Sequence, residues 1–199
     1  MQFQLPSHLT MANFNFKPSS DAATQVQKSK GGSGINEYVA SLFDQSLTWS
    51  DVDWLKSITS LPLVVKGILR PDDALEAVSR GASAVIVSNH GARQLDGVPA
   101  TIDVLRGVVD ALSGTGVEVY MDGGVRKGTD VLKALAMGAK MAFVGRPAVW
   151  GLALAGKAGV ARALDIVRDE LDNCMALSGC TSVSQVEQKD ILVKVLSNL

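Results

Sequence analysis

Short apolar runs alternate with stretches of helical period along most of the chain from residue 61 onwards. The apolar runs occupy residues 61–65, 84–88, 117–121 and 141–144. Each run is followed by a polar residue or a glycine, and a short run of this kind is typical of a buried β-strand. Strands without a polar side are buried on both faces, as in parallel sheets. The pattern therefore predicts an α/β fold built on a parallel sheet.

Helices are predicted between these runs. One begins near Pro71 and ends before Gly81, and others cover about 99–112, 129–137 and most of 148–178. Proline at the first helical position and glycine just past the end are usual start and stop signals. The alternation fits a (β/α) barrel or a doubly wound sheet, and both place their ligand at the carboxyl ends of the strands. A complete barrel has eight strands in roughly 250 residues, so four strands predict about half of one.

The beginning of the chain has a different texture. Residues 15–34 are polar, rich in Ser, Lys and Gly, and lack hydrophobic periodicity, which predicts a mobile loop. A lid over an active site and a disordered spacer are both open as its role. We therefore divide the chain into a leading segment with its mobile loop over 1–36, a half-barrel over 37–180, and a carboxyl-terminal tail over 181–199.

Composition and charge exclude several classes of protein. With 19 basic and 20 acidic residues, the net charge of -1 favours neither a nucleic acid nor an anionic membrane as partner. No stretch approaches the roughly 20 apolar residues that cross a bilayer. Cys174 and Cys180 form neither a disulfide framework nor a metal site, so no metal is expected. The final Ser197-Asn198-Leu199 differs by one residue from the peroxisomal Ser-Lys-Leu signal, so we expect a peroxisomal or otherwise a cytoplasmic protein.

Two neighbouring strand ends carry glycine and arginine together. Gly123 and Gly124 precede Arg126, and Gly145-Arg146 repeats the combination at the next strand. Glycine lets backbone approach a ligand closely, the following helix offers unpaired N–H groups, and arginine adds a charged fork. In barrels the loops after the last two strands form the recurrent phosphate site. The alternative is that the glycines only make tight turns and the arginines are solvated.

Three further polar residues follow strands. His90 is one of two histidines, and Arg93 lies three residues later, a pair suited to proton transfer and to holding a carboxylate. The alternative is a histidine that caps the following turn beside an exposed arginine. Lys66 ends the first predicted strand, where an unpaired buried ammonium would be costly. It suits an anionic cofactor or intermediate.

These strand ends resemble a known family. SNHGARQLD at 88–96, MDGGVRKGTDVLKALAMGA at 121–139 and GRP at 145–147 closely resemble the FMN-dependent 2-hydroxy acid oxidases and dehydrogenases, the family of glycolate oxidase. The likeness runs from about residue 5 to residue 180. It implies the C-terminal half of a TIM (β/α)8 barrel, about four β/α units. It also implies oxidation of a short-chain (S)-2-hydroxy acid to the 2-oxo acid on FMN, with O2 reduced to hydrogen peroxide.

The resemblance also implies roles for single residues. Lys66 would lie against the flavin N1–O2 edge and stabilise the reduced, anionic ring, and Ser88 would lie close to the flavin. His90 would take a proton from the substrate, and Arg93 would bind its carboxylate. The residues implied to hold the ribityl chain and phosphate are Asp122, Gly123, Gly124, Arg126, Gly145 and Arg146.

The chain also departs from the family pattern. We expect the first four β/α units to be missing, and with them the carboxylate that orients the base, so that two strand edges and an inner face are exposed. The expected protein is therefore a fragment of an enzyme that is a homo-oligomer when complete. The alternatives are a half-barrel that binds FMN or another phosphate ester without turnover, and an inactive fragment.

Overall fold

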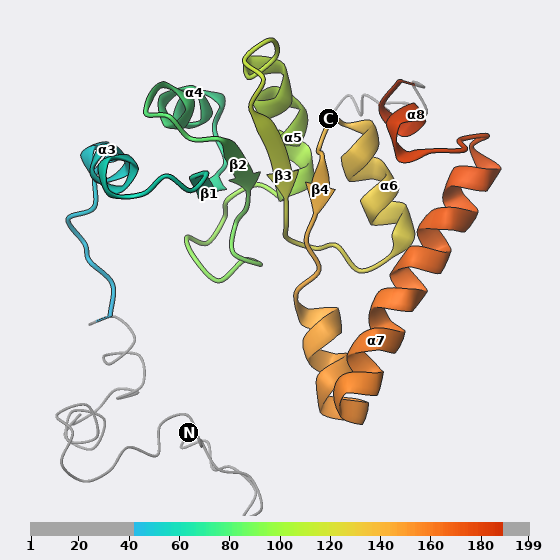
Figure 1. Ribbon diagram of the computed structural model, residues 1–199. Helices are drawn as coiled ribbons and strands as arrows, with labels where there is room; N and C mark the ends of the chain where they lie inside the picture. The colour runs from blue at the N-terminus through green and yellow to red at the C-terminus, as the bar shows by residue number, and fades with distance from the viewer. Residues whose placement is uncertain (1–41, 189–199) are drawn as a thin grey trace, which may run out of the picture. The chain divides into compact units, whose positions relative to one another are not determined.

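The computed structural model describes residues 42–188 of the chain (Figure 1). The predicted loop over 15–34, the predicted boundary after residue 36 and the final Ser197-Asn198-Leu199 lie outside the described residues. Contacts between residues divide the chain after Leu47, and the fold below is that of the unit beginning at Thr48.

Four parallel strands form one sheet in the order in which they occur along the chain. The strands are β1 Val64–Ile68, β2 Ala84–Val87, β3 Glu118–Met121 and β4 Met141–Ala142. A doubly wound sheet reverses its strand order at a switch point, whereas a barrel wall keeps chain order. The order β1-β2-β3-β4 contains no switch point and is the one expected for the predicted barrel half of four strands.

Helices connect the strands and lie beside them (Figure 1). They are α3 Trp49–Ile58, α4 Pro71–Ser79, α5 Thr101–Ala111, α6 Gly128–Ala136, α7 Arg146–Leu177 and α8 Val183–Gln188. The predicted helices are confirmed, with ends that differ by only a few residues. The helical path of α7 is broken at Ala155 and Gly156, whose backbone angles are not helical. The helix α8 lies inside the segment assigned to a tail and contacts α6.

One hydrophobic core lies between the sheet and its helices. Val85 and Val87 of β2 are 0% exposed, and Leu105 and Val108 of α5 are 0% exposed as well. A second cluster joins α6, α7 and α8 through Leu135, Met175, Cys180 and Val186. The amphipathic faces of α4, α5 and α6 thus cover one side of the sheet.

The first strand corrects two expectations. It runs over Val64–Ile68 rather than 61–65, because a bulge at Gly67, with φ of 102°, carries the pairing to β2 past Lys66. The bulge lets Ile68 face the core at 4% exposure, while the side chain of Lys66 is 45% exposed. Lys66 is therefore not a buried ammonium, and the expectation of a buried cation at this strand end is wrong.

The tryptophans separate into two groups. Trp49 is partly buried and packs against the main core, as the usual behaviour of aromatic residues predicts. Trp54 and Trp150 are 58% and 67% exposed, so neither belongs to the core.

Candidate active site

An open groove of about 750 Å³ lies at the carboxyl ends of β2, β3 and β4. The predicted site residues that line it are His90, Arg93, Asp122, Gly123, Gly124, Arg126, Gly145 and Arg146. Apolar side chains of the β4–α7 segment, among them Phe143, Pro147 and Trp150, form another part of its wall. Because parallel strands end at one edge of the sheet, residues far apart in sequence meet here.

The turn after β3 is held in place by contacts with Thr101 and Asn89. Gly123 and Gly124 have φ of 91° and 81°, in the left-handed region that favours glycine. The hydroxyl of Thr101, at the start of α5, donates to the carbonyl oxygen of Asp122 at 2.7 Å. A Cβ at Gly123 would lie 3.0 Å from Asn89 Oδ1 and from Thr101 Oγ1, whereas a Cβ at Gly124 would meet nothing within 4 Å. Gly123 therefore packs against Asn89 and Thr101, whereas the backbone at Gly124 is open to a ligand.

Thr101 was missed by the sequence analysis. Its residue is only 1% exposed, and its hydroxyl is the contact between α5 and the Asp122–Gly124 turn. The available signal was a threonine near Pro99, which indicates the start of a helix. The local pattern does not show that this hydroxyl reaches across to the next strand end.

The start of α6 differs from the expectation of free N–H groups. The N–H groups of Arg126 and Lys127 both donate to Asp130 Oδ2 at 3.0 Å. The N–H of Gly128 donates to Glu170 Oε2 on α7 at 2.8 Å. The prediction of unpaired backbone donors is therefore wrong at these three residues. An anion at this corner would depend on the Arg126 side chain and on the open backbone at Gly124.

The start of α7 has unpaired backbone N–H groups, unlike the start of α6. Within residues 42–188, the N–H groups of Gly145 and Arg146 have no acceptor. A helix N-terminus carries positive partial charge and unpaired N–H groups, which favours an anion. Together with the nearby guanidinium of Arg126 in the same groove, this makes the β4–α7 corner the better anion site.

The loop after β2 carries His90 in a turn with unusual backbone angles. His90 and Ala92 have φ of 55° and 61°, which is uncommon for residues other than glycine. Buried Ser88 accepts the N–H of His90 through Oγ at 3.1 Å, and Asn89 Oδ1 accepts the N–H of Ala92 at 3.2 Å. The amide of Gln94 lies 2.9 Å from Nδ1 of the His90 ring. Side chains of the loop itself therefore support the position of His90.

Arg93 presents a free guanidinium to the groove. It is exposed, and no carboxylate in the described part of the chain pairs with it. Arginine holds carboxylates through two parallel hydrogen bonds. The side chain is thus available to an external carboxylate beside His90, although an exposed arginine next to a turn histidine was also the alternative that the sequence left open.

Lys66 joins the site through an ion pair. Its Nζ lies 3.4 Å from Asp122 Oδ2, and the two side chains are 45% and 20% exposed. The other carboxylate oxygen, Asp122 Oδ1, is buried and has no hydrogen-bond partner. Lys66 and Ser88 are not among the residues that line the groove. Asp122 is therefore the link between β1 and the groove.

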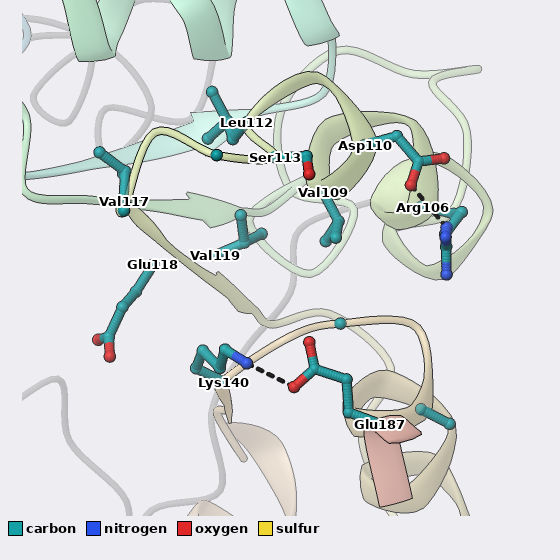
Figure 2. Close-up of a pocket in the computed structure, with 14 residues that line it drawn as sticks. Arg106, Val109, Asp110, Leu112, Ser113, Val117, Glu118, Val119, Lys140 and Glu187 are labelled. Atoms are coloured by element: carbon teal, nitrogen blue, oxygen red, sulfur yellow. Dashed lines mark hydrogen bonds and ion pairs between the residues drawn. The ribbon is translucent and has the colours of Figure 1, made fainter. Parts of the chain in front are cut away.

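A second cavity lies at the opposite ends of the strands. It has a volume of about 590 Å³ and is lined by residues that precede β3 and β4, including Val117 and Lys140. Figure 2 shows the ion pairs of Lys140 with Glu187 and of Arg106 with Asp110 at this cavity. None of the predicted site residues lies here, and the amino-terminal face of a barrel wall serves stability rather than catalysis.

No group of three His, Cys, Asp or Glu side chains among residues 42–188 is placed to hold a metal ion. None of the described helices is both long and apolar enough to span a bilayer.

Comparisons with known proteins agree on one family. The sequence model described as FMN-dependent dehydrogenase matches residues 1–193. The chain is 56% identical to mouse 2-hydroxyacid oxidase 1 over 188 residues, which are 94% of this chain and 50% of that protein. It is 51% identical to maize glycolate oxidase 1 over 193 residues, which are 97% of this chain and 51% of that protein.

Solved structures give the same result for the fold. A mandelate oxidase mutant with the monooxide FMN adduct superimposes with a TM-score of 0.69 at 48% identity, over 71% of this chain and 45% of that chain. Mandelate oxidase with (S)-2-phenylpropionate gives the same TM-score and identity, over 42% of its own chain. The chain spans about half the length of the curated relatives it matches. It belongs to the family of FMN-dependent dehydrogenases.

Proposed function

We propose that this chain carries the FMN-phosphate corner and the substrate-binding residues of an oxidase of short-chain (S)-2-hydroxy acids. The product would be the 2-oxo acid, and O2 would be reduced to hydrogen peroxide. The observation that carries the proposal is the groove, which unites His90 and Arg93 with the glycine and arginine corners of β3 and β4. Its relatives are named 2-hydroxyacid oxidase, glycolate oxidase and mandelate oxidase.

The residues of the groove fit FMN. The buried Oδ1 of Asp122 is an acceptor without a donor, which suits a hydroxyl of the ribityl chain. The backbone at Gly124 is open, and Arg126 and Arg146 bring two positive charges to the same groove for a phosphate. Gly145 and the start of α7 add unpaired N–H groups. When bound, the flavin would supply the two-electron acceptor that no amino-acid side chain provides.

The protein side chains would orient the substrate and move its proton. Arg93 would hold the carboxylate of the 2-hydroxy acid, and His90, three residues earlier, would take the proton. Asp122 would keep Lys66 near the strand ends through their 3.4 Å ion pair. Gly123 would keep the turn after β3 packed on Asn89 and Thr101, so that the open side of the turn faces the groove.

The first experiment is an FMN titration of the 199-residue chain, followed by flavin fluorescence and accompanied by a sizing column. Saturable binding supports the phosphate corner, and Arg146→Gln and Arg126→Gln should each weaken it about tenfold. Arg106→Gln is the matched control, because Arg106 pairs with Asp110 at the other cavity. Equal binding by all variants would contradict the proposed site.

A second experiment separates binding from turnover. A complete barrel would be made by adding the half of mouse 2-hydroxyacid oxidase 1 that does not align with this chain. Glycolate should bleach the flavin bound to this complete barrel. His90→Ala should slow the bleaching at least about a hundredfold, the usual contribution of a positioned base. Normal bleaching by His90→Ala would refute the assigned base.

A non-catalytic half-barrel is the second candidate function. It is favoured by the matched length, about half of each relative, and by the exposure of Val64 and Met141 on one sheet face among residues 42–188. FMN binding without bleaching in the 199-residue chain would identify this case, and aggregation without binding would identify an inactive fragment.

We also propose that the complete protein is a homo-oligomer and is peroxisomal, with a cytoplasmic location as the alternative. The location depends on Ser197-Asn198-Leu199, which are outside the described residues. A fluorescent fusion with and without these three residues would test it, since the weak signal should be lost with them.

A further inference from the structure

Arg146 makes a hydrogen bond to the loop that carries His90. Its Nη2 donates to the carbonyl oxygen of Gly91 at 3.0 Å, across 55 positions of the sequence. The bond runs from the end of β4 to the loop after β2, which are separated in the sheet by β3. The approach is close, since a Cβ at Gly91 would lie 3.2 Å from Nη2.

The other hydrogen bonds that position this loop are local. His90 N–H to Ser88 and Ala92 N–H to Asn89 span two and three positions. The contact of Gln94 with the His90 ring spans four positions. For residues 89–97, the bond from Arg146 is therefore the long-range hydrogen bond within the described part of the chain.

We infer that Arg146 is a positioning residue that couples the phosphate corner to the His90 loop. A guanidinium has five N–H donors in a rigid plane, and Gly91 uses only one nitrogen of Arg146. The remaining donors face the same groove and are free for a phosphate. An anion held there would restrain the guanidinium, and with it the carbonyl of Gly91 between His90 and Arg93. The phosphate part of this inference rests on the proposed function.

The coupling is expected in both directions. If phosphate orders the loop, then a carboxylate bound by the ordered loop must favour phosphate by the same factor. The anion that Arg93 holds and the anion that Arg146 holds would thus assist each other. Neither guanidinium needs to touch the other anion.

Hydrogen exchange on the 199-residue chain tests the inference. The readout is the peptide covering 89–97, with and without inorganic phosphate, in wild type, Arg146→Lys and Arg126→Lys. Lysine keeps the charge but lacks the planar fork. Without phosphate, Arg146→Lys should exchange about three- to tenfold faster in this peptide, the effect of one lost hydrogen bond. Phosphate should slow exchange in wild type and Arg126→Lys but not in Arg146→Lys.

The control is the peptide containing β3, whose exchange should be equal in all three proteins if they fold alike. If Arg146→Lys changes that peptide, Arg146→Gln replaces it. Unchanged exchange over 89–97 in the Arg146 variants would overturn the inference. A wild-type chain that binds no phosphate or FMN would refute the proposed function and with it the coupling, while the ligand-free comparison would still decide whether Arg146 holds the loop.

Discussion

The two faces of the sheet have opposite surroundings. On one face, Val85, Val87, Val119 and Met121 are at most 4% exposed and pack under the helices. On the other face, the register brings Lys66, Ile86, Tyr120 and Met141 into one row across all four strands. Val64 and Met141 on this open face are 45% and 48% exposed. Among residues 42–188, helices cover the first face, and side chains of the second face are exposed.

The exposed face of the sheet is the face that points to the interior of a complete barrel. In a complete barrel the inward side chains of all strands fill the interior in layers. This chain supplies inward side chains from four neighbouring strands and covers about half of its relatives' length. The groove lies at the carboxyl ends of the strands. Its residues are held by contacts with α5 and α7, which do not depend on the exposed face of the sheet.

The strongest test compares two methionines on neighbouring strands. Met121→Ala, at 2% exposure, should lower the free energy of unfolding by about 2–5 kcal/mol because it leaves a cavity in the core. Met141→Ala, at 48% exposure, should lower it by less than about 0.5 kcal/mol. Urea denaturation followed by circular dichroism measures both. Similar losses would show that something covers the open face in solution.

A second test concerns the turn at the rim. Thr101→Val should cost about 1–2 kcal/mol, because the carbonyl of Asp122 loses a buried donor. Thr115→Val is the control, since Thr115 is an exposed residue whose hydroxyl donates a similar 2.7 Å bond to the carbonyl oxygen of Leu112. FMN affinity should fall in the first variant alone. Equal losses of stability in the two variants would contradict the claim that the Thr101 hydroxyl supports the turn after β3.

The third test concerns the ion pair on the open face. Lys66→Gln should lower the free energy of unfolding by less than about 1 kcal/mol, because the pair is partly exposed and screened. The loss should shrink in 1 M salt, where the Debye length is about 3 Å and exposed charges farther apart than this are screened. Lys133→Gln is the control, as no carboxylate in residues 42–188 pairs with Lys133. If the loss of unfolding free energy were the same at low and high salt, it would come from packing of the Lys66 side chain and not from its charge.

The smallest effect is a pH dependence on the outer surface. The hydrogen bond from Arg70 lowers the pKa of Asp72 from 3.8 to about 2. A lowered carboxyl pKa stabilises the fold above 3.8, and this stabilisation is lost as the pH falls from 3.8 towards 2. An NMR titration should show the Asp72 pKa returning towards 3.8 in Arg70→Gln and staying low in Arg80→Gln. An unchanged Asp72 in Arg70→Gln would contradict the assignment.

Much of the site follows from local pattern. His90, Asp122 and Gly145 each come directly after or close to a strand, and parallel strands bring such residues to one edge. Other parts of the site do not follow from it. The acceptors Asp130 and Glu170 occupy N–H groups that the pattern left free, and Glu170 lies 42 positions from its donor. Such partners depend on which helix packs beside which, and periodicity carries no information on that.

By itself, the sequence determined the alternation of short strands and helices, the glycine turns and the polar strand ends, because these depend on neighbouring residues and on side-chain period. The tertiary structure decided the chain-order sheet that makes a barrel wall, the bulge at Gly67 that turns Ile68 to the core, and the bond from Arg146 to Gly91. These features join residues far apart in the chain. Their partners are set by strand neighbourhood and packing, which appear only when the elements are placed together.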